Sequence, residues 1–82
     1  MQIKNSMILY VKTGCQWCQK VLDYAEKEGI KFELRNIATP GIVEELISHG
    51  GKRQVPYLVD IEHTTEMYES RDIIEYLKQQ MP

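Results

Sequence analysis

An apolar run, residues 7–11, is followed at once by a helical pattern that begins near the two cysteines of the chain. The run is rich in strand-forming side chains without a polar interruption, as expected of a strand covered on both faces. A Thr-Gly pair then breaks it, and apolar residues recur at helical spacing as far as Gly29. These positions are Val21, Leu22 and Ala25. The pattern predicts a central parallel strand, a loop, and a helix with Cys15 and Cys18 at its start.

The middle of the chain predicts a second strand and a short second helix. In residues 32–36, Phe32 and Leu34 alternate with charged side chains, which suits a strand with one face better buried. A strand-helix-strand order implies a parallel, right-handed crossover. Thr39 is expected to cap the second helix with Pro40 at its first position, and the helix should end at the next pair of glycines.

The last third predicts a hairpin and a final helix. Residues 57–59 and 67–68 are strand-like, and the polar segment 60–66 between them is short enough for an antiparallel hairpin. Ser70 can cap the final helix. Its inward positions would be Ile73, Ile74 and Leu77, and its outward positions Arg71, Glu75 and Lys78. The expected fold is α/β with the order β-α-β-α-β-β-α: a four-stranded mixed sheet flanked by three helices, in a single domain over residues 1–82.

Charge and hydropathy exclude two classes of partner. The 10 basic and 12 acidic residues are scattered, and no basic block could follow a phosphate backbone, so nucleic acid is not expected. The longest apolar run, residues 7–11, is far shorter than the roughly 18–20 residues needed to cross a bilayer. No signal-peptide core follows Met1. We therefore expect a cytoplasmic protein with neither nucleic acid nor a membrane as partner. A monomer is expected as well.

The two cysteines are predicted to be redox-active. A disulfide between them would close so small a loop that it would remove little unfolded-state entropy, so a stabilising role explains the pair poorly. Cys15 stands where the loop meets the helix, and the unpaired N–H groups there favour its thiolate. Lys12 and Lys20 add positive charge nearby. Cys18, one turn on, lies on the same side of the helix and can attack a mixed disulfide formed on Cys15.

The alternative for the cysteines is half of a zinc site. Such a site would need two more ligands, and the two histidines, His49 and His63, are 14 residues apart, which does not match a zinc-finger pair. No metal site is predicted. Each histidine is expected at the solvated surface, with an accessory role in proton transfer left open.

Three segments resemble the glutaredoxin family of thioredoxin-like folds. Residues 10–18, ending in Cys15-Gln16-Trp17-Cys18, look like the strand, lysine and redox loop of that family. Residues 54–57 are similar to its segment with a cis-proline, and the final helix also matches. The resemblance implies a glutathione-dependent oxidoreductase that reduces protein–glutathione mixed disulfides and protein disulfides. It further implies glutathione as the reductant and no tightly bound cofactor.

The resemblance also implies the roles of the residues around the sulfur chemistry. Cys15 would be the nucleophile and Cys18 the resolving thiol. The backbone of Val55, beside a cis peptide bond to Pro56, would pair with the cysteinyl part of glutathione. Trp17 would form one wall of the glutathione groove, although simple partial burial would also explain it.

Cations and an amide are implied at the glycine end of glutathione. Lys12, together with Arg53 or Gln54, would receive the glycine carboxylate, because a cation suits a carboxylate. The alternative for each of the three is a solvated loop residue.

Two features depart from the small glutaredoxins. Gln16 and Trp17 stand where many dithiol glutaredoxins have Pro-Tyr, which leaves the redox potential and iron-sulfur cluster binding open. Residues 67–74 look more like the N-terminal domain of glutathione transferases. In that motif Glu69 and Ser70 would meet the γ-glutamyl end of glutathione, whose carboxylate the helix N-terminus attracts. Ser70 could equally be an ordinary N-cap.

Two other functions of the same fold therefore stay open. One is a module in which Cys15 and glutathione from two chains hold an iron-sulfur cluster. The other is a transferase-like domain that binds glutathione without redox turnover. The cysteine pair favours exchange chemistry, because activating the thiol of glutathione itself does not require it.

Overall fold

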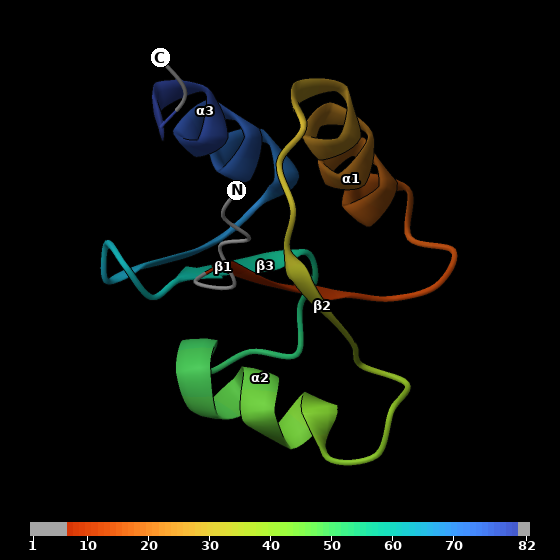
Figure 1. The fold of residues 1–82 in the computed structure, drawn as a ribbon. Coiled ribbons are helices and arrows are strands. Elements are labelled where there is room, and N and C mark those ends of the chain that lie inside the picture. The colour runs from red at the N-terminus through yellow and green to blue at the C-terminus, as the bar shows by residue number, and fades with distance from the viewer. Residues whose placement is uncertain (1–6, 81–82) are drawn as a thin grey trace.

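The computed structural model describes residues 7–80, and within them a mixed sheet lies between two layers of helices (Figure 1). The predicted domain, residues 1–82, extends beyond the described residues at both ends. In chain order the elements are β1 (Met7–Val11), α1 (Gln16–Glu28), β2 (Glu33–Asn36), α2 (Ile42–Gly50), β3 (Tyr57–Asp60), β4 (Thr65–Tyr68) and α3 (Ser70–Gln80). The predicted element order is confirmed.

The sheet has the strand order β2-β1-β3-β4, which places β1 inside it as predicted. β1 runs parallel to β2 and antiparallel to β3, so that Leu9 lies opposite Leu34 on one side and Leu58 on the other. β3 and β4 form the predicted antiparallel pair.

The helices cover the two faces of the sheet unequally. α1 and α3 lie side by side on one face and α2 lies alone on the other (Figure 1). Because side chains alternate along a strand, β1 sends Leu9 and Val11 to the α1–α3 face and Ile8 and Tyr10 to the α2 face. Over residues 7–80, no helix combines the length and the apolar composition that crossing a bilayer requires.

The exposure of Leu34 departs from prediction. Leu34 was expected on the better-buried face of its strand, yet it is 53% exposed. Its register opposite Leu9 points it to the α1–α3 face, but β2 is an edge strand, and the helices cover the centre of that face. Arg35, on the opposite side of β2, is half-buried and reaches Glu45 of α2.

The start of α2 also differs from the prediction. The chain first turns at Asn36, whose side-chain oxygen accepts a hydrogen bond from the N–H of Ala38 (2.8 Å). Gly41 then has a φ of 90°, a left-handed conformation that no right-handed helix can include. The helix therefore begins at Ile42, and the predicted cap at Thr39 with Pro40 at the first position is wrong.

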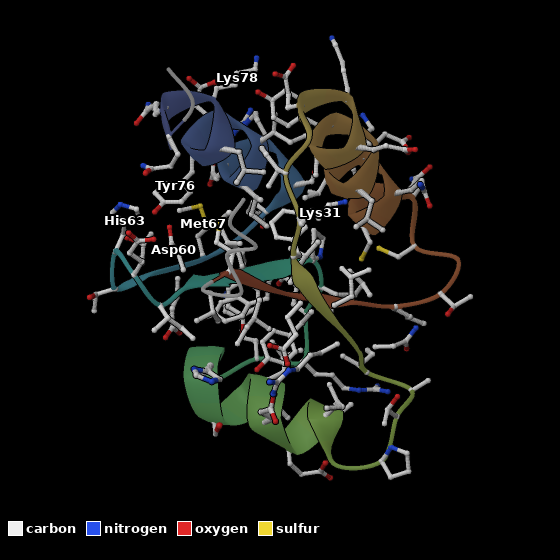
Figure 2. The ribbon with its side chains drawn as sticks, in the orientation of Figure 1. Lys31, Asp60, His63, Met67, Tyr76 and Lys78 are labelled. Carbon is white, nitrogen blue, oxygen red and sulfur yellow. The ribbon has the colours of Figure 1, made fainter. Side chains whose placement is uncertain are left out.

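The predicted polar connection 60–66 contains the ends of two strands. Asp60 is the last residue of β3 and only 2% exposed, so the hairpin loop comprises residues 61–64. The carboxylate of Asp60 accepts a hydrogen bond from Tyr76 Oη of α3 (2.6 Å) and lies 2.8 Å from His63 Nδ1 (Figure 2). Asp60, which the sequence places in a polar loop, is therefore a buried residue that connects the hairpin to α3 through a hydrogen bond.

Candidate functional site

Cys15 occupies the N-cap of α1, as predicted. Its backbone is extended (φ −86°, ψ 114°), and its Sγ accepts a hydrogen bond from the backbone N–H of Cys18 at 3.2 Å. The N–H of Cys15 itself donates to the carbonyl of Lys12 (3.2 Å), which closes the loop between β1 and α1. One N–H of the first helical turn therefore points at the Cys15 sulfur.

The two cysteines have different surroundings. Both are free thiols, but Cys15 is partly exposed, whereas Cys18 is 2% exposed and packs in the core. Burial, and then the hydrogen bond with Cys15, raises the pKa of the Cys18 thiol to about 12. Cys18 is therefore a protonated thiol at neutral pH, and Cys15 is the accessible one.

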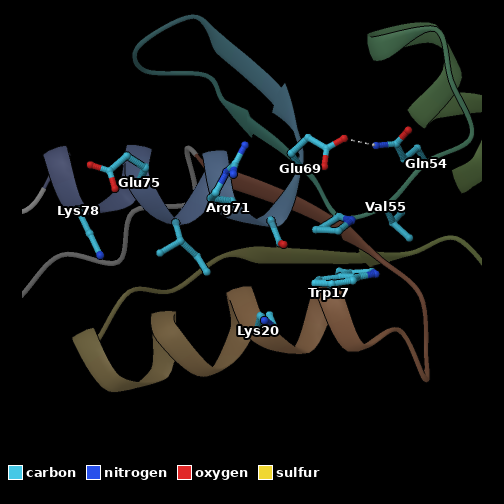
Figure 3. A pocket seen from close by; sticks show the side chains of 11 residues that line it. Trp17, Lys20, Gln54, Val55, Glu69, Arg71, Glu75 and Lys78 are labelled. Atoms are coloured by element: carbon cyan, nitrogen blue, oxygen red, sulfur yellow. Dashed lines mark hydrogen bonds between the residues drawn. The ribbon is translucent and has the colours of Figure 1, made fainter.

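A groove of about 850 Å³ runs between α1 and α3 (Figure 3). The side chain of Gln54 crosses one end of this α1–α3 groove and donates a hydrogen bond to Glu69 (3.2 Å). The Val55–Pro56 peptide bond there is cis, as the family resemblance implied. Among the residues predicted to contact glutathione, those that line the groove are Trp17, Gln54, Val55, Pro56, Glu69 and Ser70.

Trp17 and Lys20 form part of the α1 side of the groove. The indole is 49% exposed, and the Lys20 ammonium lies 5.1 Å from the centre of its ring. This is a cation–π distance, so the two side chains contact each other on the α1 side of the groove.

A second hollow, of about 680 Å³, lies beside the loop between β1 and α1 and is called here the cysteine hollow. Cys15, Cys18 and Lys12 line it, and Asn36 of β2 closes one side by donating a hydrogen bond to the Thr13 hydroxyl (2.9 Å). The structure thus separates Lys12 from the residues grouped around Gln54. Lys20 lines both hollows, and exposed Arg53 lines neither.

The junction between β4 and α3 differs from the predicted cap. α3 begins at Ser70, and the carbonyl of Glu69 accepts the first helical bond, from the N–H of Ile73 (2.9 Å). Glu69 therefore holds the cap position, and Ser70 is the first helical residue rather than the N-cap. Glu69 also has a φ of 74°, an uncommon conformation for a residue with a side chain, and such residues cluster at binding sites.

The sequence reasoning missed part of the groove lining. Arg71, Glu75 and Lys78 are exposed, as predicted, but they also line the α1–α3 groove together with Ile74. Their spacing of three and four residues is the available signal, because residues at that spacing share one side of a helix. Only the position of α1 opposite α3 makes that side the wall of a groove.

Both histidines are exposed, as predicted, and each lies against a carboxylate. His49 Nδ1 is 3.3 Å from Glu66, and His63 is paired with Asp60. No cluster of three or more His, Cys, Asp or Glu side chains suited to a metal ion occurs in the part of the chain that the structure describes.

Comparison with protein families settles the relationship of the chain. Residues 9–82 match the family described as glutathione S-transferase, N-terminal domain. The chain belongs to this family. A sequence comparison with curated proteins gave no match.

Several solved structures share the fold of this chain. Glutaredoxin 2 from Salmonella typhimurium in complex with glutathione is 27% identical with a TM-score of 0.74, over 94% of this chain and 34% of that one. A glutathione S-transferase from Methylobacillus flagellatus with GSH bound is 26% identical with a TM-score of 0.75, over 94% of this chain and 38% of that one. A glutaredoxin from Archaeoglobus fulgidus, 20% identical with a TM-score of 0.72, covers 90% of this chain and 87% of its own.

These comparisons confirm both the predicted thioredoxin-like fold and the resemblance to glutaredoxins and the transferase N-terminal domain. The chain spans about a third of the length of several of these proteins, including a glutathione S-transferase from the clam Laternula elliptica, of which it covers 35%.

Proposed function

We propose that this domain is a glutathione-dependent thiol–disulfide oxidoreductase that reduces protein–glutathione mixed disulfides and protein disulfides. One observation carries the proposal: a partly exposed cysteine sulfur accepts an N–H bond at the start of α1, with a buried second thiol one turn on. Exchange with protein disulfides uses both features, because the accessible sulfur attacks first and the second thiol then resolves the mixed disulfide.

Glutathione would bind at the end of the α1–α3 groove nearest Gln54. Its γ-glutamyl end would meet Glu69 and Ser70, where the free N–H groups of α3 attract a carboxylate. Its cysteinyl part would pair with the backbone of Val55 and pack on Trp17, both of which line the groove.

The residues predicted for the glycine carboxylate of glutathione lie in different places. Lys12, Arg53 and Gln54 were predicted for it, and of these Gln54 lies in the groove while Lys12 lines the cysteine hollow. Lys12 remains the proposed cation because its carbonyl bonds the N–H of Cys15, which keeps it beside the reacting sulfur.

The first step is attack of the Cys15 thiolate on the glutathione sulfur of a mixed disulfide. A bond forms between Cys15 Sγ and that sulfur, the sulfur–sulfur bond to the protein breaks, and the protein leaves as a thiolate that takes up a proton from water. A second glutathione thiolate then attacks the enzyme-bound glutathione, which releases glutathione disulfide and restores the Cys15 thiolate.

Cys18 would act on substrates that are protein disulfides. Attack of Cys15 leaves a mixed disulfide with the protein, and Cys18 can displace the protein by forming the Cys15–Cys18 disulfide, with loss of its own proton. Because the pKa of the Cys18 thiol is raised to about 12, this second attack requires proton removal in the mixed disulfide.

A second candidate is a glutathione-binding domain of the transferase type, without redox turnover. The family match over residues 9–82 favours it. In that case the groove would bind glutathione whether or not Cys15 is present.

The test is a coupled assay with a small glutathione mixed disulfide, glutathione and glutathione reductase. Cys15→Ser should be inactive in every exchange reaction. Cys18→Ser should still reduce glutathione mixed disulfides, because free glutathione resolves the intermediate, but should lose most activity on protein disulfides. Circular dichroism of both variants checks that each is folded.

Full exchange activity in Cys15→Ser would reverse the assigned roles. The transferase type would be established by two results together. The wild-type protein would show no exchange activity, and Cys15→Ser would still bind glutathione and conjugate it to an electrophile.

Alkylation separates the two thiols directly. With iodoacetamide at neutral pH, Cys18→Ser should react at Cys15, whereas Cys15→Ser should react at Cys18 at least about tenfold more slowly, because its thiol is buried and its pKa is raised. Equal rates would contradict the different environments of the two sulfurs.

A further inference from the structure

The α1–α3 groove continues well past the residues assigned to glutathione. Ser70 and Lys78 both line it, and eight residues of helix span about 12 Å. The part beyond Ser70, called here the outer groove, is lined by Lys20, Arg71, Ile74, Glu75 and Lys78 (Figure 3). A tripeptide whose γ-glutamyl end is held at Ser70 does not occupy this part.

The outer groove carries the charge opposite to that of the whole chain. Lys20, Arg71 and Lys78 stand against the single carboxylate of Glu75, whereas the chain has a formal net charge of -2. Within residues 7–80, none of these three cations forms an ion pair. Figure 3 shows Lys78 turned toward α1. Unpaired cations gathered in one hollow attract an anionic ligand.

The shape and apolar surface fit a polypeptide better than a small anion. Half-buried Ile74 lies between the charged residues, and Trp17, 49% exposed, lies at the inner end. An extended chain advances about 3.3–3.6 Å per residue, so about 12 Å accommodates three to four residues. One apolar side chain, that of Ile74, among cations suits a segment with an apolar side chain among acidic ones.

We propose that the outer groove binds an acidic segment of the glutathionylated protein, adjacent to its modified cysteine. This inference rests on the proposed function, because it places the glutathione part of the substrate at Ser70 and the protein part beyond it. The domain would then select among glutathionylated proteins by the charge that flanks the cysteine.

The experiment compares two glutathionylated peptides of equal length. In the first peptide, the four residues on each side of the cysteine include Asp, Glu and one Leu. In the second peptide, Asn replaces each Asp and Gln replaces each Glu. The unmodified protein should have a kcat/KM about tenfold higher for the acidic peptide at low ionic strength, and added salt should reduce the ratio.

Double charge-reversal variants test whether the outer groove causes the preference for the acidic peptide. In Arg71→Glu with Lys78→Glu, the ratio of kcat/KM for the acidic peptide to kcat/KM for the neutral peptide should fall to about one or below. Lys27→Glu with Lys31→Glu is the matched control, since both lysines are exposed, lie outside the groove lining and change the net charge equally. This control variant should retain most of the preference for the acidic peptide, measured as the same ratio of kcat/KM values.

The outcomes separate this inference from the function on which it rests. Equal kcat/KM for the two peptides, or the same ratio in both double variants, overturns the outer groove as the selective site while leaving the exchange activity established. No turnover of either peptide or of the small mixed disulfide overturns the proposed function, and this inference with it.

Discussion

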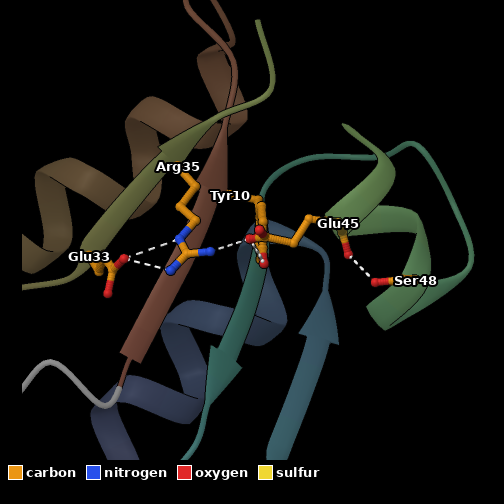
Figure 4. Close-up of polar contacts among 5 residues, drawn as sticks. All are labelled: Tyr10, Glu33, Arg35, Glu45 and Ser48. Carbon is orange, nitrogen blue, oxygen red and sulfur yellow. Dashed lines mark hydrogen bonds and ion pairs between the residues drawn. The ribbon is translucent and has the colours of Figure 1, made fainter. Parts of the chain in front are cut away.

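The face of the sheet under α1 and α3 is packed with aliphatic side chains, whereas the face under α2 is built around tyrosines bonded to carboxylates. The buried cluster on the first face consists of Leu9, Val11, Cys18, Val21, Leu58, Ile73 and Leu77. On the second face, Tyr10 Oη donates a hydrogen bond to Glu45 (2.6 Å), and Arg35 bonds the same carboxylate (Figure 4). Tyr57 likewise donates to Glu66.

The two faces also differ in where the hollows lie. Both hollows lie along α1, on the face whose buried cluster is mostly aliphatic. On the α2 face, burial and then the bond to Glu45 raise the pKa of Tyr10 well above its ordinary value. The bonds from Tyr10 and Arg35 in turn lower the pKa of Glu45. Two tyrosine–carboxylate contacts, Tyr10–Glu45 and Tyr57–Glu66, therefore make the stability of the α2 face depend on pH, whereas the α3 side has one such contact, Tyr76–Asp60.

Matched leucine truncations on the two faces should have the largest effects. Leu77 of α3 is 1% exposed and Leu46, the buried residue of α2, is 0% exposed. Leu77→Ala should lower the free energy of unfolding by about 3–5 kcal/mol, because its cavity is enclosed by two helices and the sheet. Leu46→Ala should cost about 2–3 kcal/mol, because a short helix with one buried residue can settle into the space. Urea unfolding of both variants measures the difference.

The same pair distinguishes the faces by function. At temperatures where both variants are folded, Leu77→Ala should impair the exchange reaction more, because α3 carries one wall of the groove. A larger loss of activity in Leu46→Ala would mean that the α2 face supports the site more than its contacts indicate.

Gly50→Ala should destabilise the α2 face through a steric clash. A Cβ at Gly50 would overlap Tyr68 Oη. That hydroxyl donates a hydrogen bond to the Lys52 carbonyl (2.9 Å) and accepts one from the Lys52 N–H (3.1 Å). Tyr68 also packs on Tyr57 at 4.3 Å between ring centres, so it cannot move away freely. We expect a loss of about 1–3 kcal/mol of stability by thermal unfolding.

Ser48→Ala is the control on the same helix, since its exposed hydroxyl bonds the Glu45 carbonyl one turn earlier and no other group within residues 7–80. A cost for Gly50→Ala as small as that of Ser48→Ala would show that the α2 face relaxes more readily than its polar contacts suggest.

Alkaline pH should weaken the α2 face through its tyrosines. The folded pKa values of Tyr10 and Tyr57 are raised above the unfolded value of about 10, so their contribution is complete below pH 10 and is lost as pH rises further. Tyr10→Phe with Tyr57→Phe should cost about 1 kcal/mol per hydrogen bond at pH 7. The difference in free energy of unfolding between this double variant and the wild-type protein should become smaller above pH 10, as measured by urea unfolding from pH 7 to 11.

Tyr24→Phe is the control on the aliphatic face, because no hydrogen bond of the Tyr24 hydroxyl occurs within residues 7–80. It should change stability at pH 7 much less. A gap that stays constant from pH 7 to 11 in the double variant would remove the pH sensitivity assigned to α2.

The sequence by itself determined the order of the elements, the central strand and the cysteines at the start of α1. These features depend on near neighbours in the chain: the apolar run of residues 7–11, the periodicity of the first helix, and Gly29, whose φ of 74° ends that helix as predicted. The pairing of Cys15 with the N–H of Cys18 is equally local, since only three residues separate them.

Only the tertiary structure decided which side chains are buried and which share a groove. The sequence places Asp60 in a polar loop, whereas in the structure Tyr76, 16 residues away, donates a hydrogen bond to its carboxylate. Leu34 reads as buried until the sheet order places β2 at an edge. Lys78 becomes part of the groove because α3 lies against α1. In each case the deciding neighbour is distant in the chain, and burial depends on where those distant elements pack rather than on the residue's own local pattern.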